Sequence, residues 1–319
     1  MQTDQESEGQ SVERRLASWP AMARIVGRLL HVWPEHRTYI EARYRDMEPA
    51  FEDRTEELAE LALVSIGDEM DRYVSDYRWM CEAFLDEEIH FRRHGGYRLS
   101  TFEEAYEQVY SDPAIMDRYV RGILISQIVW MPHAQAFDTF RREFVDRADA
   151  GSRYLEVGPG HGFFLYFASR KPDIATLEAW DVSKSSIEET KKSLAALGAQ
   201  REITITRQDI LEAPARPESF DMAVISEVLE HLERPEIALK TLLASLRPGG
   251  RIFINAPVNS PAPDHIYLWR DTEEFEKFVT DQGFEIEQAW HFPVTGASLD
   301  RAKKKQLSIS CVLIARKPA

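Results

Sequence analysis

The stretch RYLEVGPGHGFFLYFA, residues 153–168, decides the fold class of this chain. Its first part, RYLEV, predicts a short buried strand, and its last part, FFLYFA, predicts a helix with an apolar face that packs on a sheet. Gly158, Gly160 and Gly162 lie in the turn between them. A turn without side chains lets a ligand approach the backbone N–H groups at the helix start, so the stretch predicts a nucleotide-type pocket.

The spacing of the glycines does not match the dinucleotide-binding fingerprint. The dinucleotide fingerprint, G-x-G-x-x-G, requires a third glycine where this chain has Phe163 or Leu165. The chain has E-x-G-x-G-x-G instead, with Glu156 on the predicted strand. Asp181 ends the next apolar run, TLEAWDVS, and an acid in that place can bind both hydroxyls of a ribose. The pattern therefore predicts a nucleotide-type ligand that is not a dinucleotide.

From residue 150 onward, predicted strands and helices alternate, which indicates an α/β fold with a parallel sheet and helices on both faces. The last two strands, 284–292 and 306–316, suit an antiparallel hairpin at the sheet edge. The predicted loop between them is basic and contains Lys303, Lys304 and Lys305. The other strands are predicted at 154–157, 176–181, 203–207, 222–226 and 251–255, and the helices at 162–169, 184–197, 235–246 and 272–282.

The part of the chain before residue 150 has a helical pattern and no strand-like alternation. Thr101 followed by Glu104 is a capping box, and Asp112 followed by Pro113 indicates another helix start. The chain therefore divides into three predicted parts, which are a disordered tail (1–11), an all-helical lid or substrate domain (12–132) and an α/β domain (133–319).

The composition limits the classes of partner. The net charge of −15 argues against a nucleic-acid backbone or an anionic membrane as the substrate surface, because like charges repel. The longest apolar stretch, 122–131, is too short for a membrane span, and the opening MQTDQESEGQ is unlike a signal peptide. Cys81 and Cys311 lie far apart, so no disulfide framework is indicated. We expect a cytoplasmic protein with a small or protein-borne substrate, and a homodimer is one option for its oligomeric state.

Together these motifs resemble those of the class I S-adenosylmethionine-dependent methyltransferases, over residues 137–319. The resemblance implies a Rossmann-like sheet of parallel strands with a C-terminal antiparallel hairpin, and S-adenosylmethionine as the cofactor. The cofactor-binding positions that it implies are Glu156, Gly158 and Gly160 for the methionine portion, Asp181 for the ribose, Val182 for the adenine face, Asp209 for the adenine amino group with Ile210 as its apolar neighbour, and Ser226 with Glu227 beside the methyl group.

Two features bear on the methyl acceptor. The fourth strand ends in SEVLEH rather than the N/D-P-P-Y typical of amino methylation of bases, so nucleobase methylation is not expected. The proline-rich segment 255–270 is too long for a plain connection and is a functional-loop candidate, with an ordered surface loop as the alternative. It offers Asp264 and His265 as a base, and Tyr267 with Trp269 as an aromatic wall.

The helical domain is expected to complete the substrate pocket, because the nucleotide fold alone does not supply one. His133, on the segment that leads into the first strand, is the preferred catalytic candidate there. The alternative is that the aromatic residues of this domain form only its own core.

A metal site is a further hypothesis, and it rests on the sequence EVLEH, residues 227–231. If a helix begins there, Glu227, Glu230 and His231 point the same way. With His265, this set is similar to the metal site of small-RNA 2'-O-methyltransferases and of ubiquinone-pathway O-methyltransferases. Magnesium, manganese and iron all suit mixed oxygen and nitrogen ligands. The alternative is a metal-free site in which the acid faces the cofactor and the histidine caps a helix, with His133 or His265 as the simple catalytic base.

The sequence thus predicts an enzyme that moves the methyl group of S-adenosylmethionine to a small molecule, with an oxygen acceptor preferred over nitrogen and carbon. Because the sulfonium methyl group is already activated, the protein needs chiefly positioning, water exclusion and one base. Two alternatives stay open, which are methylation of a protein or carrier-bound substrate and a non-catalytic protein that binds S-adenosylmethionine.

Overall fold

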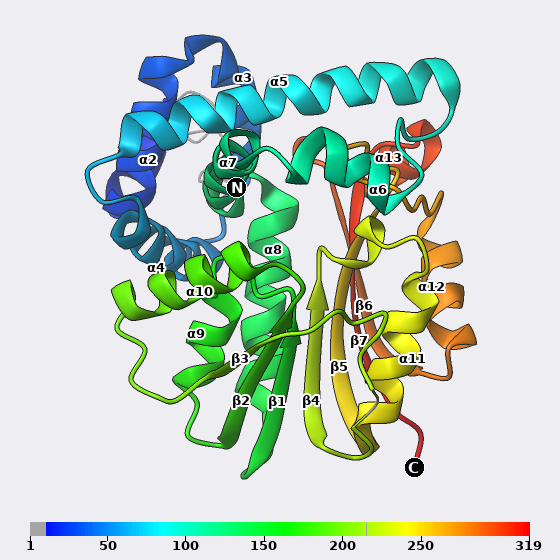
Figure 1. Ribbon diagram of the computed structural model, residues 1–319. Helices are drawn as coiled ribbons and strands as arrows, with labels where there is room; N and C mark the ends of the chain where they lie inside the picture. Colours follow the sequence, from blue (N-terminus) through cyan, green and yellow to red (C-terminus); the bar gives the residue numbers. More distant parts are fainter. Residues whose placement is uncertain (1–10, 215) are drawn as a thin grey trace, which may run out of the picture.

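A computed structural model describes residues 11–319 except residue 215, so the predicted tail, 1–11, lies outside the described residues apart from Ser11. Figure 1 shows an α/β part below and a set of helices above it. These helices, residues 12–132, are called the helical region below. They lie across the ends of the central strands, so the helical region is placed to cover any ligand bound there.

One seven-stranded sheet forms the α/β part, in the order β3-β2-β1-β4-β5-β7-β6. The pairs from β3 through β5 are parallel, and β7 is antiparallel to both β5 and β6. The predicted Rossmann-like fold with an antiparallel hairpin at the sheet edge is therefore confirmed. The strands are Ser152–Val157 (β1), Ile174–Asp181 (β2), Thr204–Arg207 (β3), Phe220–Ser226 (β4), Leu246–Val258 (β5), Glu285–Pro293 (β6) and Ile309–Arg316 (β7).

Each face of the sheet buries its own hydrophobic core, because successive side chains of a strand point to opposite faces. In β1, Tyr154 belongs to the first core, whereas Leu155 and Val157 belong to the second. Helices α9 and α10 cover the first core, and α11 and α12 cover the second (Figure 1). The helices of this part are Phe163–Ser169 (α9), Lys184–Ala196 (α10), Pro235–Ser245 (α11), Thr272–Asp281 (α12) and Leu299–Lys305 (α13).

The sheet has its topological switch point between β1 and β4. In open α/β sheets, ligands bind outside the carboxyl ends of the strands at such a point. The glycine turn follows β1 and the SEVLEH segment ends β4. The fold therefore brings both motifs to the same edge of the sheet, beside the switch point.

The described residues of the helical region contain no strand, as predicted. The capping box at Thr101 and Glu104 is present, and the Asp112 carboxylate accepts a hydrogen bond from Ala114 N–H. No helix among the described residues is both long enough and apolar enough to cross a membrane. The α- and π-helices up to the first strand are Val12–Arg15 (α1), Pro20–Val32 (α2), Arg37–Arg43 (α3), Pro49–Ile66 (α4), Met70–His94 (α5), Phe102–Ala105 (α6), the π-helix Tyr106–Tyr110 (η3), Pro113–Val129 (α7), Met131–Thr139 (α8) and the π-helix Phe140–Phe144 (η4).

The first hydrophobic core continues from the helical region into the α/β part. It joins Met80 on α5 and Ile125 on α7 to Phe253 on β5. Helix α8 crosses the predicted domain boundary between residues 132 and 133 and packs against β6 and β7. Cutting the chain at that boundary would expose apolar surface on both sides. The three-part division of the chain therefore stays a prediction.

Two local predictions from the sequence are wrong. The lysines at 303–305 lie in helix α13 rather than in a loop, and this helix starts where Ser298 Oγ accepts a hydrogen bond from Arg301 N–H. The helix start at Glu227, which the metal hypothesis takes as its condition, does not form, because this residue has a left-handed φ of 53°. Only the 3₁₀ turn Leu229–His231 (η6) follows it.

Candidate functional site

The glycine turn after β1 combines close packing with an open face. Gly158 and Gly160 have φ values of 69° and 50°, in the left-handed region that favours glycine. A Cβ atom on Gly158 would lie 2.6 Å from Cγ2 of Val228, in the segment after β4. A Cβ atom on Gly160 would meet nothing within 4 Å. The turn is therefore packed on the β4 side at Gly158 and open for a ligand at Gly160.

Glu156 is a buried carboxyl group on β1, immediately before this turn. Its Oε2 accepts a hydrogen bond of 2.8 Å from the hydroxyl of Tyr154. Burial raises the pKa of Glu156 to about 8, although the hydrogen bond from Tyr154 acts in the opposite direction. Glu156 therefore carries a proton at neutral pH and can become an anion when a cation approaches it.

The side chain of Asp181, at the end of β2, is held by hydrogen bonds from residues that follow it closely in the chain. Its carboxylate accepts hydrogen bonds from Ser183 N–H at 2.8 Å and from Ser186 Oγ at 2.7 Å. Burial raises the pKa of Asp181. Val182 beside it leaves 48% of its surface exposed, which suits an apolar contact with a flat ring. The side chain has acceptor capacity left for a ligand, because a carboxylate offers about four lone-pair sites.

Asp209 follows β3, at the same edge of the sheet as Asp181. Gln208 N–H donates a 2.9 Å hydrogen bond to the carbonyl of Asp181, which keeps the two strand ends together. The Asp209 carboxylate accepts from Leu211 N–H at 2.8 Å, and Ile210 is buried. The candidate cofactor half of the site thus lies along the carboxyl ends of β1, β2 and β3, and it comprises Glu156, Gly158, Gly160, Asp181, Val182, Asp209 and Ile210.

Asn255 on β5 holds the end of β4 in place. Its amide nitrogen donates to Glu227 Oε1 at 2.9 Å and to Ser226 Oγ at 3.2 Å. Its backbone carbonyl accepts from Glu227 N–H at 2.8 Å. Burial raises the pKa of Glu227 to about 7. Asn255 is therefore a site residue with a role that the sequence did not predict, since the sequence places it only at the junction of a strand and the functional-loop candidate 255–270.

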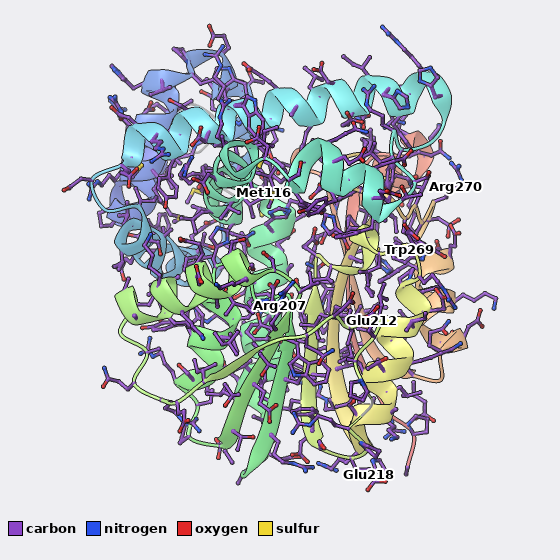
Figure 2. All side chains as sticks on the ribbon, viewed as in Figure 1. Met116, Arg207, Glu212, Glu218, Trp269 and Arg270 are labelled. Atoms are coloured by element: carbon purple, nitrogen blue, oxygen red, sulfur yellow. The ribbon has the colours of Figure 1, made fainter. Side chains whose placement is uncertain are left out.

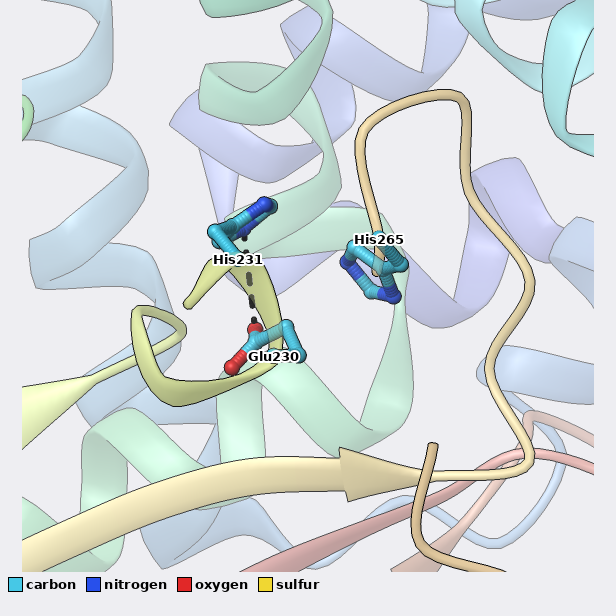
Figure 3. Close-up of side chains that lie close together, drawn as sticks. All are labelled: Glu230, His231 and His265. Atoms are coloured by element: carbon cyan, nitrogen blue, oxygen red, sulfur yellow. Dashed lines mark ion pairs between the residues drawn. The ribbon is translucent and has the colours of Figure 1, made fainter. Parts of the chain in front are cut away.

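Glu230, His231 and His265 form a compact group, called the acceptor cluster below (Figure 3). One ligand atom from each of the three lies within 4.8 Å of the others. Neither carboxylate oxygen of Glu230 has a hydrogen-bond partner among the described residues, and the nearest approach to His231 Nε2 is 3.8 Å. Burial, with the charge of Glu227, raises the pKa of Glu230 well above its ordinary value. The neighbouring carboxyl group of Glu227 can share a hydrogen bond with Glu230 only if one of the two is protonated, so this buried pair needs a proton, a ligand or a cation.

The two histidines of the cluster differ in their surroundings. His265 Nδ1 lies 2.6 Å from the backbone carbonyl of Ser260, and burial lowers the pKa of His265 to about 4. The rings of His231 and His265 lie nearly perpendicular, with centroids 4.9 Å apart. His231 Nδ1 lies 3.1 Å from the carbonyl oxygen of Asp264. Both rings therefore have Nδ1 engaged with a backbone acceptor.

The helical region reaches the cluster through tyrosines that sequence reasoning missed. Tyr110 hydroxyl lies 3.2 Å from His231 Nδ1 and donates to Asp264 Oδ2 at 3.1 Å. Tyr119 hydroxyl donates to Asp264 Oδ1 at 3.0 Å. Nothing in the sequence pairs these residues with Asp264, which lies 154 and 145 positions further along the chain.

Other predicted residues do not join the acceptor cluster. His133 lies on α8, with its Nδ1 3.0 Å from Ser126 Oγ and its ring against Trp130 in the helical region. Burial lowers the pKa of His133 to about 4. The predicted aromatic wall is wrong, because Trp269, labelled in Figure 2, is buried in the second core and Tyr267 is partly buried against it. Both rings contact Phe278 of α12. Glu227 lies outside the compact group of the described residues, since the helix expected to align it is absent.

Comparison with known proteins agrees with this arrangement. The family model described as "Methyltransferase domain" matches residues 155–254. The chain carries a class I methyltransferase domain. The matched residues run from β1 to β5 and include the glycine turn, Asp181, Asp209 and the SEVLEH segment.

Several proteins with known names resemble the chain around this methyltransferase domain. The methyltransferase GfsG of Streptomyces halstedii is 27% identical over 125 residues, which cover 39% of this chain and 45% of that protein. A ubiquinone biosynthesis O-methyltransferase of Parvibaculum lavamentivorans is 30% identical over 139 residues, which cover 40% and 53%. The chain thus spans about half the length of these curated relatives. Among solved structures, the N-methyltransferase NodS of Bradyrhizobium japonicum is similar at 18% identity, with a TM-score of 0.49 and coverage of 68% of this chain and 100% of that chain.

Proposed function

We propose that the protein transfers a methyl group from S-adenosylmethionine to an oxygen atom of a small molecule. The proposal rests on one observation, which is that two different sets of residues lie at the same edge of the sheet. An open glycine turn with Asp181 lies on one side, and the buried acceptor cluster lies on the other. The first suits an adenosyl ligand, and the second offers a base for an acceptor hydroxyl.

The residues of the cofactor half fit S-adenosylmethionine. The open space at Gly160 admits a ligand against the backbone, Asp181 has acceptor capacity for ribose hydroxyls, and exposed Val182 suits an adenine ring. Asp209 and Ile210 would bind the far edge of the adenine. When bound, the cofactor supplies a methyl group whose bond to sulfur breaks as its bond to the acceptor oxygen forms, leaving S-adenosylhomocysteine.

His231 is the residue we assign as the base. Its Nδ1 is engaged with the Asp264 carbonyl, and its Nε2 faces Glu230 at 3.8 Å without being hydrogen-bonded to it. An imidazole nitrogen in this position can take the proton that an alcohol or phenol loses as it attacks. His265 would line the same space. His133 remains a candidate only if the acceptor extends into the helical region.

The choice of acceptor rests on charge and on the relatives. The net charge of −15 favours a small molecule over a nucleic acid, and the ubiquinone-pathway relatives carry O-methyltransferase in their names. Nitrogen and carbon acceptors, a protein or carrier-bound substrate, and a non-catalytic S-adenosylmethionine-binding protein are the alternatives. Cytoplasmic location and a homodimer remain predictions.

A turnover assay tests the proposal. The purified chain is incubated with methyl-labelled S-adenosylmethionine and, in separate reactions, with catechol, an aliphatic alcohol and a primary amine, and each product is identified by mass spectrometry. We expect a methyl ether from a hydroxyl acceptor, and none with Asp181→Ala at low cofactor concentration. Methylation of the amine alone would contradict oxygen transfer. Tight cofactor binding without product from any acceptor would favour the non-catalytic alternative.

A divalent metal is a second candidate for the acceptor cluster. Glu230 offers two unpartnered buried oxygens beside His231 and His265, which is a mixed oxygen and nitrogen ligand set that suits magnesium, manganese or iron. A bound cation would hold an acceptor oxygen and lower its pKa. Elemental analysis of the purified protein, with turnover measured before and after EDTA, tests this role. Metal-free protein with a rate unchanged by EDTA would exclude it.

A further inference from the structure

We propose that Tyr110 and Tyr119 of the helical region are positioning residues that act through Asp264 to hold His231 in one tautomer, with the lone pair on Nε2. The catalytic role of that lone pair rests on the proposed function, whereas the tautomer of His231 does not depend on it. The helical region would then orient the catalytic histidine, in addition to covering the site.

Asp264 is the centre of the arrangement. Only 2% of its surface is exposed, so its carboxylate cannot rely on water. Each carboxylate oxygen receives one phenol, Oδ1 from Tyr119 at 3.0 Å and Oδ2 from Tyr110 at 3.1 Å. Each phenol is the donor in its bond, because a carboxylate oxygen can only accept. The two tyrosines thus satisfy a buried charge and fix the loop that carries it.

The hydrogen bonds around His231 determine which ring nitrogen carries the proton. The backbone carbonyl of Asp264, 3.1 Å from Nδ1, can only accept. Asp264 Oδ2 can only accept the proton of Tyr110, and when Tyr110 donates there its oxygen, 3.2 Å from the same nitrogen, is left to accept. Asp264 Oδ2, at 3.5 Å from Nδ1, adds a favourable charge. Every neighbour of Nδ1 is therefore an acceptor, and a neutral ring with its proton on Nδ1 has its lone pair on Nε2.

This geometry serves the acceptor cluster whether or not a metal is present. Nε2 is the nitrogen that faces Glu230, and a lone pair there can accept a proton from a hydroxyl or bind a cation. Tyr110 closes the π-helix η3, a rare local geometry that is frequent at functional sites. Its hydroxyl reaches both His231 and Asp264 from an element far away in sequence. A shift of η3 would therefore alter the histidine directly.

The test uses the full chain with ¹⁵N-labelled histidine, free and with S-adenosylhomocysteine. Long-range ¹H–¹⁵N correlation spectra distinguish the two imidazole tautomers, and His231→Gln identifies the signal of His231. The variants are Tyr110→Phe, Tyr119→Phe and the double substitution. Tyr106→Phe is the matched control, because Tyr106 lies on the same π-helix but is 53% exposed. Thermal unfolding and S-adenosylhomocysteine affinity are measured for every variant, so that loss of folding is recognised.

The expected result is a single His231 tautomer with the proton on Nδ1 in the wild type and in Tyr106→Phe, and a mixture of tautomers in the double variant. This readout needs no turnover, so it stands even if no acceptor is found. A wild-type signal with the proton on Nε2, or a folded double variant with an unchanged tautomer, would overturn the inference.

Kinetics with the hydroxyl acceptor used in the turnover assay gives a second readout. For the double variant we expect kcat to fall about ten- to hundred-fold, as for other groups that orient a catalytic ligand, with the KM for the cofactor unchanged. In a His231→Gln background the same two substitutions should cause no further loss of kcat. A further loss of equal size in that background would mean that the tyrosines act on the fold rather than through His231, and would overturn the inference.

Discussion

Asp181, which is half-buried, and Asp264, which is buried, are both acids of the candidate site, but they are held in different ways. Asp181 receives its hydrogen bonds from Ser183 and Ser186, two and five positions further along the chain. Asp264 receives its hydrogen bonds from Tyr119 and Tyr110, 145 and 154 positions away. The cofactor half is thus built from short local segments, whereas the acceptor cluster is completed by a separate helical region. A mutation in the cofactor half should therefore weaken cofactor binding, and a mutation in the acceptor cluster should lower turnover, each with little effect on the other property.

Substitution of His231 is expected to have the largest effect. His231→Ala should lower kcat by about 10²- to 10⁴-fold, because the base that takes the acceptor proton is lost. The affinity for S-adenosylhomocysteine should stay within about two-fold of the wild type, because His231 belongs to the acceptor cluster. Steady-state kinetics and calorimetry measure the two quantities, with exposed His94→Ala as the control. An equal loss of cofactor affinity would mean that the two halves are not separable.

Substitution of Asp181 should have the opposite signature. Asp181→Ala should weaken S-adenosylhomocysteine binding by about 2–3 kcal/mol, because charge-assisted hydrogen bonds to the ribose are lost. At saturating cofactor the rate should change little. Asp173→Ala, an exposed acid before β2, is the matched control for charge. Unchanged binding in Asp181→Ala would show that the ribose lies elsewhere.

The glycine turn offers a comparison within the cofactor half. Gly158→Ala should destabilise the protein by about 2 kcal/mol, because a strained φ is combined with a contact of 2.6 Å to Val228. Gly160→Ala has the strain but no neighbour within 4 Å, so it should cost about 1 kcal/mol of stability and act mainly on cofactor affinity. Denaturant unfolding and calorimetry separate the two effects. Equal losses of stability would contradict the open face at Gly160.

The smallest expected effect is a pH dependence in the cofactor half. The free protein keeps Glu156 protonated up to a pKa of about 8. If the cationic methionine portion binds beside it, binding favours the ionised form and releases up to one proton below pH 8. Affinity should therefore rise with pH and level off above about 8, where Glu156 is already ionised. Calorimetry in buffers of different ionisation enthalpy measures the release. Proton release of the same size from Glu156→Gln would assign it to another group.

Most of the fold could be predicted because its signals are local. The glycine turn, the alternation of apolar strands with helices, and the caps at Thr101 and Asp112 each depend on a few consecutive residues. The basic segment at 303–305 is helical although a loop was predicted, because charge indicates exposure but does not separate a helix from a loop. The local signal for this helix is the cap at Ser298. The left-handed φ of Glu227 has no local sequence signal, and this residue is hydrogen-bonded to Asn255 on β5, which is distant in sequence.

The acceptor side could be predicted only in part. Glu230, His231 and His265 were named from the sequence, and the structure brings them together. Tyr110 and Tyr119 could not be predicted in the same way. A tyrosine in an amphipathic helix shows the same spacing in the sequence whether it packs in a core or donates a hydrogen bond to an acid. Tyr267 and Trp269 were assigned to the pocket from their place in the loop, but burial in the second core is more favourable for large aromatic rings. Long-range partners of this kind follow from tertiary packing and not from local pattern.

One titration tests the central claim most directly, namely that the open glycine turn and Asp181 form an adenosyl site. S-adenosylhomocysteine and NADH are each titrated calorimetrically into the full-length protein. The account predicts one S-adenosylhomocysteine bound per chain at micromolar affinity and no binding of NADH. Binding of NADH without any heat from S-adenosylhomocysteine would contradict it.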